Sequence, residues 1–210
     1  CVKKDNEMKH KFGNISSVAT IDLDLGISAS KLQRILDKQT WKGNPQNRQA
    51  MWKPYAHPKL QEIHAYLSAP EFRRPLLEHL YSLDHNLTYF GQDRRDLKWL
   101  WNGCDAARMD EICGFEVYFV RDAPNWQTHV HIDRIGHPFV GIIHLNEENQ
   151  LFRTEFADNP QLDNRFTVPH GYGQGWMQAN HVNTWHNGAN RHPTEYRYGI
   201  MMNWGFVPSL

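Results

Sequence analysis

The sequence of 210 residues contains few cysteines and no long hydrophobic run. Its three cysteines, Cys1, Cys104 and Cys113, are too few for the disulfide framework of a small secreted domain. No segment approaches the roughly 18 uncharged apolar residues that indicate a membrane-spanning helix. The first residues also lack the apolar core of a signal peptide. We therefore expect no membrane span and a reducing compartment, which favours the cytoplasm.

Neither sign of charge is in excess, because 23 Lys and Arg residues balance 23 Asp and Glu residues. Nucleic-acid-binding proteins usually carry a basic surplus or stripe, so a nucleic-acid partner is not expected. The hydrophobic fraction of 40% is that of a globular protein once glycine is added. Histidine is abundant, with 13 residues. Histidine is the commonest metal ligand and a frequent proton carrier, so its positions in the sequence indicate where a functional site could lie.

Hydrophobic periodicity changes near Gly114. Before it, apolar residues recur every three or four positions and predict helices over residues 28–37, 58–67 and 71–83, preceded by an edge strand over 18–23. After it, short alternating runs lie between Gly, Pro, Asn and Asp turns, which is typical of an antiparallel sandwich or barrel. We predict a single domain, 1–210, that is mainly β with flanking α. A mainly helical support region, 28–101, packs outside a β core, 114–206.

Candidate metal ligands lie in this β core. His131 and Asp133 are two residues apart in an expected strand over 129–133, so their side chains point to one face. A His-x-Asp pair and one distant His form the facial triad of non-haem Fe(II) oxygenases, which leaves coordination positions open. Two histidines downstream, His181 and His186, are candidates for the distant ligand.

Taken together, these motifs resemble the 2-oxoglutarate/Fe(II)-dependent dioxygenases, particularly their prolyl-hydroxylase-like branch, over Phe115–Trp204. The resemblance rests on the His-x-Asp pair, the distal His, a following Arg197 that opens an apolar strand, and an intermediate strand that ends in His144-Leu145-Asn146. It implies a double-stranded β-helix, a jelly-roll or cupin-like barrel. It also favours His186 over His181, because Trp-His followed by Asn-Gly and an Arg-bearing strand matches the order in the family.

The resemblance implies a role for each matched residue. His131, Asp133 and His186 would bind Fe(II). Arg197 would pair with the distal carboxylate of the cosubstrate 2-oxoglutarate, and His144 lies where the prolyl-hydroxylase branch often has a Tyr bound to that carboxylate. With O₂, the implied reaction is hydroxylation of a C–H bond in a small molecule, an amino acid or a peptide side chain, with succinate and CO₂ as coproducts.

His129 leaves a second interpretation open. It would share a face with His131, and a His-x-His pair is typical of a cupin. The usual cupin pattern also has a Glu four or five positions later, where this chain has Ile135 and Gly136. A cupin-type metal protein that does not use 2-oxoglutarate therefore remains the alternative, and a non-catalytic interaction module is a further one.

Residues beside the metal motif are candidates for the substrate pocket or for support of the ligands. They are Arg121, Trp126, His129 and Arg134. The two arginines could hold a carboxylate or phosphate group, which would suit an amino acid, a peptide or another small acid. Nothing in the sequence indicates the oligomeric state.

Overall fold

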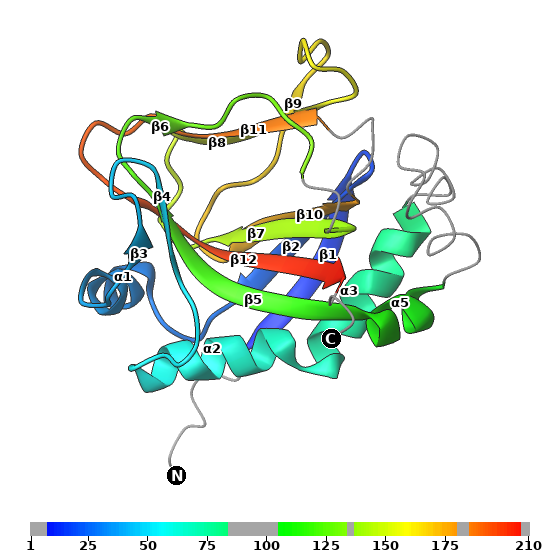
Figure 1. Cartoon of the computed structure of the whole chain (residues 1–210), viewed down its shortest axis with the longest axis horizontal. Coiled ribbons are helices and arrows are strands. Elements are labelled where there is room, and N and C mark those ends of the chain that lie inside the picture. Colours follow the sequence, from blue (N-terminus) through cyan, green and yellow to red (C-terminus); the bar gives the residue numbers. More distant parts are fainter. Residues whose placement is uncertain (1–7, 84–104, 134–136, 180–184, 207–210) are drawn as a thin grey trace.

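Two antiparallel sheets face one another in the computed structural model, which describes residues 8–83, 105–133, 137–179 and 185–206 (Figure 1). In spatial order, the larger sheet consists of β1 (Lys9–Ile15), β2 (Val18–Asp24), β10 (Gln174–Ala179), β7 (Phe139–His144), β12 (Arg197–Phe206), β5 (Cys113–Asp122), β4 (Arg48–Met51) and β3 (Lys42–Gly43). The smaller sheet consists of β6 (Trp126–Gln127), β11 (Trp185–Asn190), β8 (Phe152–Ala157) and β9 (Phe166–Thr167). This arrangement confirms the predicted mainly β fold of the jelly-roll, double-stranded β-helix type.

Helices cover the face of the larger sheet that points away from the smaller one (Figure 1). The described helices are α1 (Ala29–Asp37), α2 (Pro58–Ser68), α3 (Pro70–Leu83) and α5 (Ala106–Ile112). Alternate residues of β12, such as Ile200, Met202 and Trp204, are fully buried in one apolar cluster with the inward faces of these helices. None of the described helices has the length and apolar character needed to cross a membrane.

The structure refines several predictions for the N-terminal half. The three predicted helices are confirmed as α1, α2 and α3. The prediction of an edge strand at 18–23 is wrong, because β2 pairs with β1 on one side and β10 on the other. β1 was not predicted from the sequence, because its residues are mostly polar and only partly buried. The predicted support region, 28–101, also contributes β3 and β4 to the larger sheet, and its residues 84–101 lie outside the described residues.

The space between the two sheets is more polar than the helix-covered side. A smaller apolar cluster, which includes Val140, Ile142, Phe156, Trp176 and Met201, lines part of it. The buried polar side chains that share this space are Asp122, His144, Gln178, His186 and Arg197. Because buried polar groups need partners, such a concentration marks a candidate functional site.

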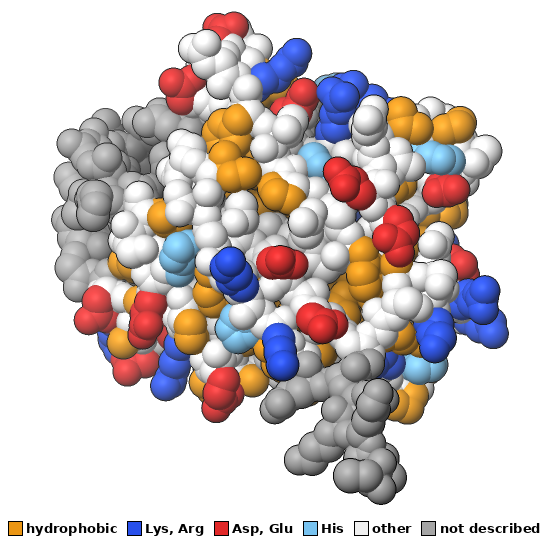
Figure 2. Space-filling view, turned by 180° about the vertical axis from the view of Figure 1, so that it is seen from behind, with side chains coloured by type: hydrophobic (Ala, Val, Ile, Leu, Met, Phe, Trp, Pro, Cys, Tyr) orange, Lys and Arg blue, Asp and Glu red, His pale blue; other side chains and the backbone are white. Residues whose placement is uncertain are grey.

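Acidic and basic side chains are interspersed on the face of the molecule shown in Figure 2. This distribution agrees with the zero formal net charge of the sequence.

Candidate metal centre

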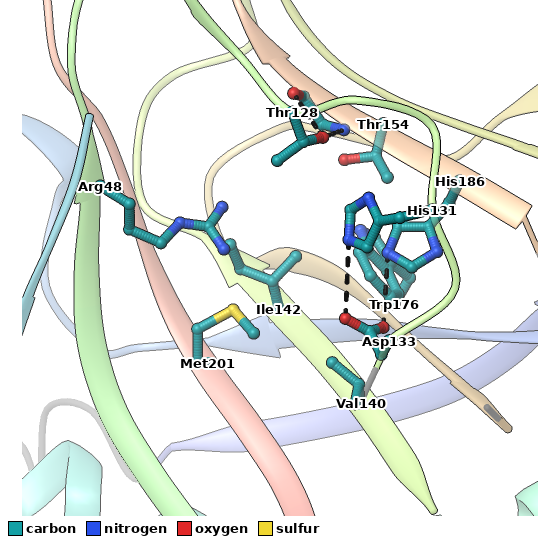
Figure 3. Close-up of a pocket in the computed structure, with 11 residues that line it drawn as sticks. Arg48, Thr128, His131, Asp133, Val140, Ile142, Thr154, Trp176, His186 and Met201 are labelled. Atoms are coloured by element: carbon teal, nitrogen blue, oxygen red, sulfur yellow. Dashed lines mark hydrogen bonds and ion pairs between the residues drawn. The ribbon is translucent and has the colours of Figure 1, made fainter. Parts of the chain in front are cut away.

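His131, Asp133 and His186 converge between the sheets (Figure 3). One ligand atom from each residue lies within 4.8 Å of the others. Asp133 Oδ1 is 3.7 Å from His131 Nε2, and Asp133 Oδ2 is 3.4 Å from His186 Nε2. Two imidazoles and one carboxylate on one side of a cavity form the donor set of a facial triad.

A single backbone bridge brings the two histidines together. His186 lies in β11, whereas His131 lies in an irregular segment, so the predicted strand over 129–133 is wrong. The His131 N–H donates to the His186 carbonyl at 3.0 Å, and the His186 N–H donates to the His131 carbonyl at 2.9 Å. Thr128 also donates its backbone N–H to Gly188 O. This segment therefore aligns with β11 through a few bonds without forming a regular strand.

The hydrogen bond at the other ring nitrogen of His131 prepares this residue for a metal. His131 Nδ1 lies 2.7 Å from the carbonyl oxygen of His129 and must carry a proton to donate to it. In the neutral ring, Nε2, which faces Asp133, then carries the lone pair that a metal requires. Such support of the outer nitrogen orients metal-ligating imidazoles in proteins. Without a metal, the hydrogen bond to Asp133 favours a proton on Nε2 and raises the pKa of His131.

Gln178 of β10 provides the corresponding support for His186. Its side-chain amide lies 3.0 Å from His186 Nδ1, and its Oε1 has no hydrogen-bond partner among the described residues. Metal binding through Nε2 requires a proton on Nδ1, and thus an acceptor beside it. Rotation of the amide by half a turn places Oε1 there. In the unrotated amide, Gln178 Nε2 also donates to Asp133 Oδ2 at 3.4 Å, a hydrogen bond that the rotated amide gives up.

Asp133 is held in its ionised form. Burial alone raises the pKa of the Asp133 carboxyl, but the neighbouring His131 and the positive charge of His186 outweigh this effect and lower the pKa below its usual value. A carboxylate at neutral pH is the form that binds a metal cation.

The cavity beside the triad has apolar walls and a charged end. Ile142, Met201 and Trp176 line it together with Arg48 (Figure 3). Arg48 lies opposite Asp122 on β5, and Arg197 of β12 lies opposite the same residue on the other side. The three neighbouring strands β4, β5 and β12 thus form a row of positive, negative and positive side chains.

Asp122 is fully buried and is shared by both arginines. Arg48 Nε and Nη2 donate to its two carboxylate oxygens at 2.6 and 3.1 Å. Arg197 Nε and Nη2 are 2.8 and 2.6 Å from Asp122 Oδ2. Burial raises the pKa of Asp122, but the two guanidinium charges outweigh burial and lower it. The row is therefore fully ionised at neutral pH.

His144 lies on β7, two residues beyond Ile142, and is buried. Neither of its ring nitrogens has a hydrogen-bond partner among the described residues. The ring of His170 is 5.3 Å away, and His170 Nε2 accepts the backbone N–H of Thr154 at 2.7 Å. Burial, followed by the charge of Arg197, holds the pKa of His144 well below its usual value. A neutral imidazole here retains one N–H that can donate to a ligand.

The remaining candidate residues are dispersed. Arg121 donates to Gln49 and stacks on Trp41 and Tyr196, and it does not line the cavity of the triad. Trp126 covers the Arg48 guanidinium at 4.9 Å. The exposed His129 lines a groove that also includes Trp126. Arg134 and His181 lie outside the described residues.

Sequence reasoning missed Arg48, Gln178 and His170. Gln178 offered a signal, since it follows Trp176 by two positions in an otherwise apolar run and therefore faces the same side. Arg48 and His170 offered none, because their place depends on contacts with residues far away in the chain.

His170 should make stability depend on pH. Burial, and then the charge of Arg197, lowers the pKa of His170 to about 4, whereas the ordinary value is 6.5. Between these values the unfolded chain binds a proton that the folded chain does not, so stability falls as pH decreases from 6.5 to 4. Urea unfolding should show a smaller loss between pH 7 and pH 5 in His170→Gln than in the wild type. An equal loss would contradict this role, and the exposed His129→Gln serves as the control.

Comparison with known proteins identifies the fold. No protein-family model and no curated protein matches the chain. Among solved structures, a prolyl-4-hydroxylase from Pseudomonas putida matches with a TM-score of 0.53 and 12% identity, over 95% of this chain and 92% of that one. A Trichoplax adhaerens prolyl hydroxylase, in complex with a hypoxia-inducible-factor peptide fragment, matches with a TM-score of 0.55 and 13% identity, over 92% and 85%.

A third similar structure is HygX from Streptomyces hygroscopicus, which has nickel and 2-oxoglutarate bound. It matches with a TM-score of 0.54 and 9% identity, over 92% of this chain and 84% of that one. At these identities the likeness concerns the fold, and the functional argument must come from the site itself. The chain therefore has the double-stranded β-helix fold of the 2-oxoglutarate/Fe(II) oxygenases, with a His-Asp-His cluster between its two sheets.

Proposed function

We propose that this protein is an Fe(II)- and 2-oxoglutarate-dependent oxygenase that hydroxylates a C–H bond. The observation that carries the proposal is the pairing of the His131, Asp133 and His186 cluster with a positively charged end of the same cavity. The first feature suits a divalent cation and the second suits a carboxylate. A 2-oxo dicarboxylic acid offers one group to each.

The charges between the sheets fit this pair of ligands. Arg48 and Arg197 together balance Asp122 and Asp133, so these four residues carry no net charge. A divalent cation alone would leave two buried positive charges, and a dicarboxylate alone would leave two negative ones. Bound together, the two ligands restore neutrality, which is favourable because uncompensated buried charge is expensive.

Unpartnered polar atoms support an oxygen-rich ligand. Both nitrogens of the buried His144 have no hydrogen-bond partner among the described residues, and a buried polar group without a partner is destabilising by about 1–3 kcal/mol. A carboxylate at the charged end would accept a hydrogen bond from the N–H of this imidazole. The sequence pattern implied that both Arg197 and His144 bind this carboxylate. In this proposal His144 keeps that role, and Arg197 contributes to the charged end through its bonds to Asp122.

Each part of the cavity has a task in this proposal. His131, Asp133 and His186 would hold the iron, which supplies the oxidising chemistry together with O₂ and the 2-oxo acid. Gln178 keeps His186 oriented. Ile142, Trp176 and Met201 exclude water from one side of the site, so that the substrate C–H bond is the group that reacts.

The substrate proposed is a small molecule, an amino acid or a peptide side chain. A groove beside His131 offers access, and its other lining residues are Gln46, Asn47, Asn125, Trp126, Gln127, Thr128 and His129. None of these lining residues is Asp, Glu, Lys or Arg. The peptide complex of the similar Trichoplax enzyme supports keeping a peptide among the candidates.

The proposal is tested by anaerobic titration of 2-oxoglutarate into the Fe(II)-loaded protein. A visible charge-transfer band should appear as the 2-oxo acid chelates the iron. Succinate, which lacks the 2-oxo group, should give no band and is the control. Bound iron without a band would contradict the proposal and favour the cupin alternative, although the exposed His129 lies outside the cluster of the three ligands.

A further inference from the structure

The two arginines that share Asp122 differ in their access to the cavity. Arg197 is 2% exposed, and its Nη1 donates to the carbonyls of Arg153 and Ala189 at 3.0 and 3.3 Å. Its Nε and Nη2 are bound to Asp122. Every nitrogen of the Arg197 guanidinium is therefore engaged with the protein. It does not line the cavity that the triad shares.

Arg48 differs from Arg197 because one nitrogen of its guanidinium has no partner among the described residues. Its side chain is 33% exposed and lines the same cavity as His131 and Asp133, with its guanidinium directed into it (Figure 3). Nε and Nη2 bind Asp122, while Nη1 has no hydrogen-bond partner among the described residues. Arg48 comes from β4, which precedes in sequence the β core, 114–206, that the sequence pattern identified.

The surroundings of Arg48 fix its position. Asp122 holds the guanidinium through two hydrogen bonds, and the Trp126 ring covers it at 4.9 Å. Ordering before binding reduces the entropy that a ligand must overcome. Two guanidinium charges also face a single carboxylate in this row, so one positive charge is left for an incoming anion.

We propose that Arg48 binds the distal carboxylate of the 2-oxo acid directly, and that Arg197 is a positioning residue that holds Asp122 against Arg48. The inference rests on the proposed function. A planar guanidinium with one free edge is well suited to a carboxylate. Thr154, whose side chain lies on the same cavity wall, is placed to add a hydroxyl contact.

The test compares two ligands that differ only at the distal end. 2-Oxoglutarate and 2-oxopentanoate share the chelating 2-oxo acid, but only the former has the second carboxylate. Their dissociation constants are measured by calorimetry on Zn(II)-loaded wild type, Arg48→Met and Arg48→Gln. Arg108→Met, at an exposed arginine paired with Glu111, is the control.

We expect both Arg48 variants to bind 2-oxoglutarate roughly 10- to 100-fold more weakly, and 2-oxopentanoate as the wild type does. The amide of Arg48→Gln can still donate to Asp122, so this variant tests the role if Arg48→Met fails to fold. A wild-type preference for 2-oxoglutarate in the folded variants would overturn the inference. Failure of the wild type itself to bind 2-oxoglutarate would instead contradict the proposed function.

Discussion

Asp122→Asn is expected to lower the free energy of unfolding by about 3–5 kcal/mol. The substitution keeps the size of the side chain but removes the negative charge that Arg48 and Arg197 share. Since Asp122 is fully buried and Arg197 nearly so, water cannot replace the lost partner. Two neighbouring positive charges would then face each other between β4 and β12 with only a neutral amide between them.

Urea denaturation at pH 7 measures this effect, with Asp110→Asn as a matched control. Asp110 also binds two arginines, Arg73 and Arg74, but their side chains are 26% and 61% exposed. Its loss should be clearly smaller because solvent screens the remaining charges. A loss below about 1 kcal/mol for Asp122→Asn would contradict the role of the buried row.

The effect of Asp122 should also depend on pH. Because the two arginines lower the pKa of Asp122 in the folded protein, its stabilisation is present above the ordinary carboxyl pKa. It is lost as pH falls through the lower folded value. The stability difference between wild type and Asp122→Asn should therefore narrow in acid.

His186→Ala is expected to reduce metal affinity by more than about 100-fold and to abolish iron-dependent turnover. Substitution of a residue that merely orients a ligand already reduces affinity roughly 10- to 100-fold, and loss of one of three ligands is more severe. The absorption spectrum of the Co(II)-substituted protein, with metal content after dialysis, measures binding. His131→Ala should behave in the same way.

Three further variants separate the possible ligands. His129→Ala should retain the metal, because its exposed ring lies outside the His131, Asp133 and His186 cluster. Retention is also expected for His181→Ala. If His181→Ala loses the metal and His186→Ala keeps it, the assignment of the distal ligand is wrong. Gln178→Leu should fall between these results, since it removes contacts to His186 Nδ1 and Asp133 Oδ2 but no ligand.

Local patterns were sufficient to predict much of the fold. Period-two alternation and turn residues identified the β core, and apolar periodicity identified α1, α2 and α3. His131 and Asp133 were found by their spacing, although the reason they converge is different. The expected strand is absent, and a single bridge to His186 aligns them. The two side chains still converge, because both the expected strand and the observed irregular segment place them near β11.

The charged end of the cavity could not be predicted in the same way. Arg48 and Asp122 are 74 residues apart, and they meet only because β4 and β5 pair in a particular register. The same register argument applies to Arg197, whose engagement with Asp122 is invisible in the sequence around it. Local spacing reports which side chains share a strand, whereas strand pairing decides which charges face one another.

The fold has two apolar clusters, one that stabilises it and one that lines the cavity of the candidate site. The larger one joins the helices to the outer face of the larger sheet, through residues such as Leu60, Leu76 and Trp204. The smaller one, with Ile142 and Met201, lines the cavity. The larger cluster contains most of the buried apolar residues. We therefore expect substitutions in the smaller cluster, which change the size and shape of the cavity, to cause only a modest loss of thermal stability. A scaffold divided in this way lets the residues that line the cavity vary while the helix-covered core keeps the fold stable.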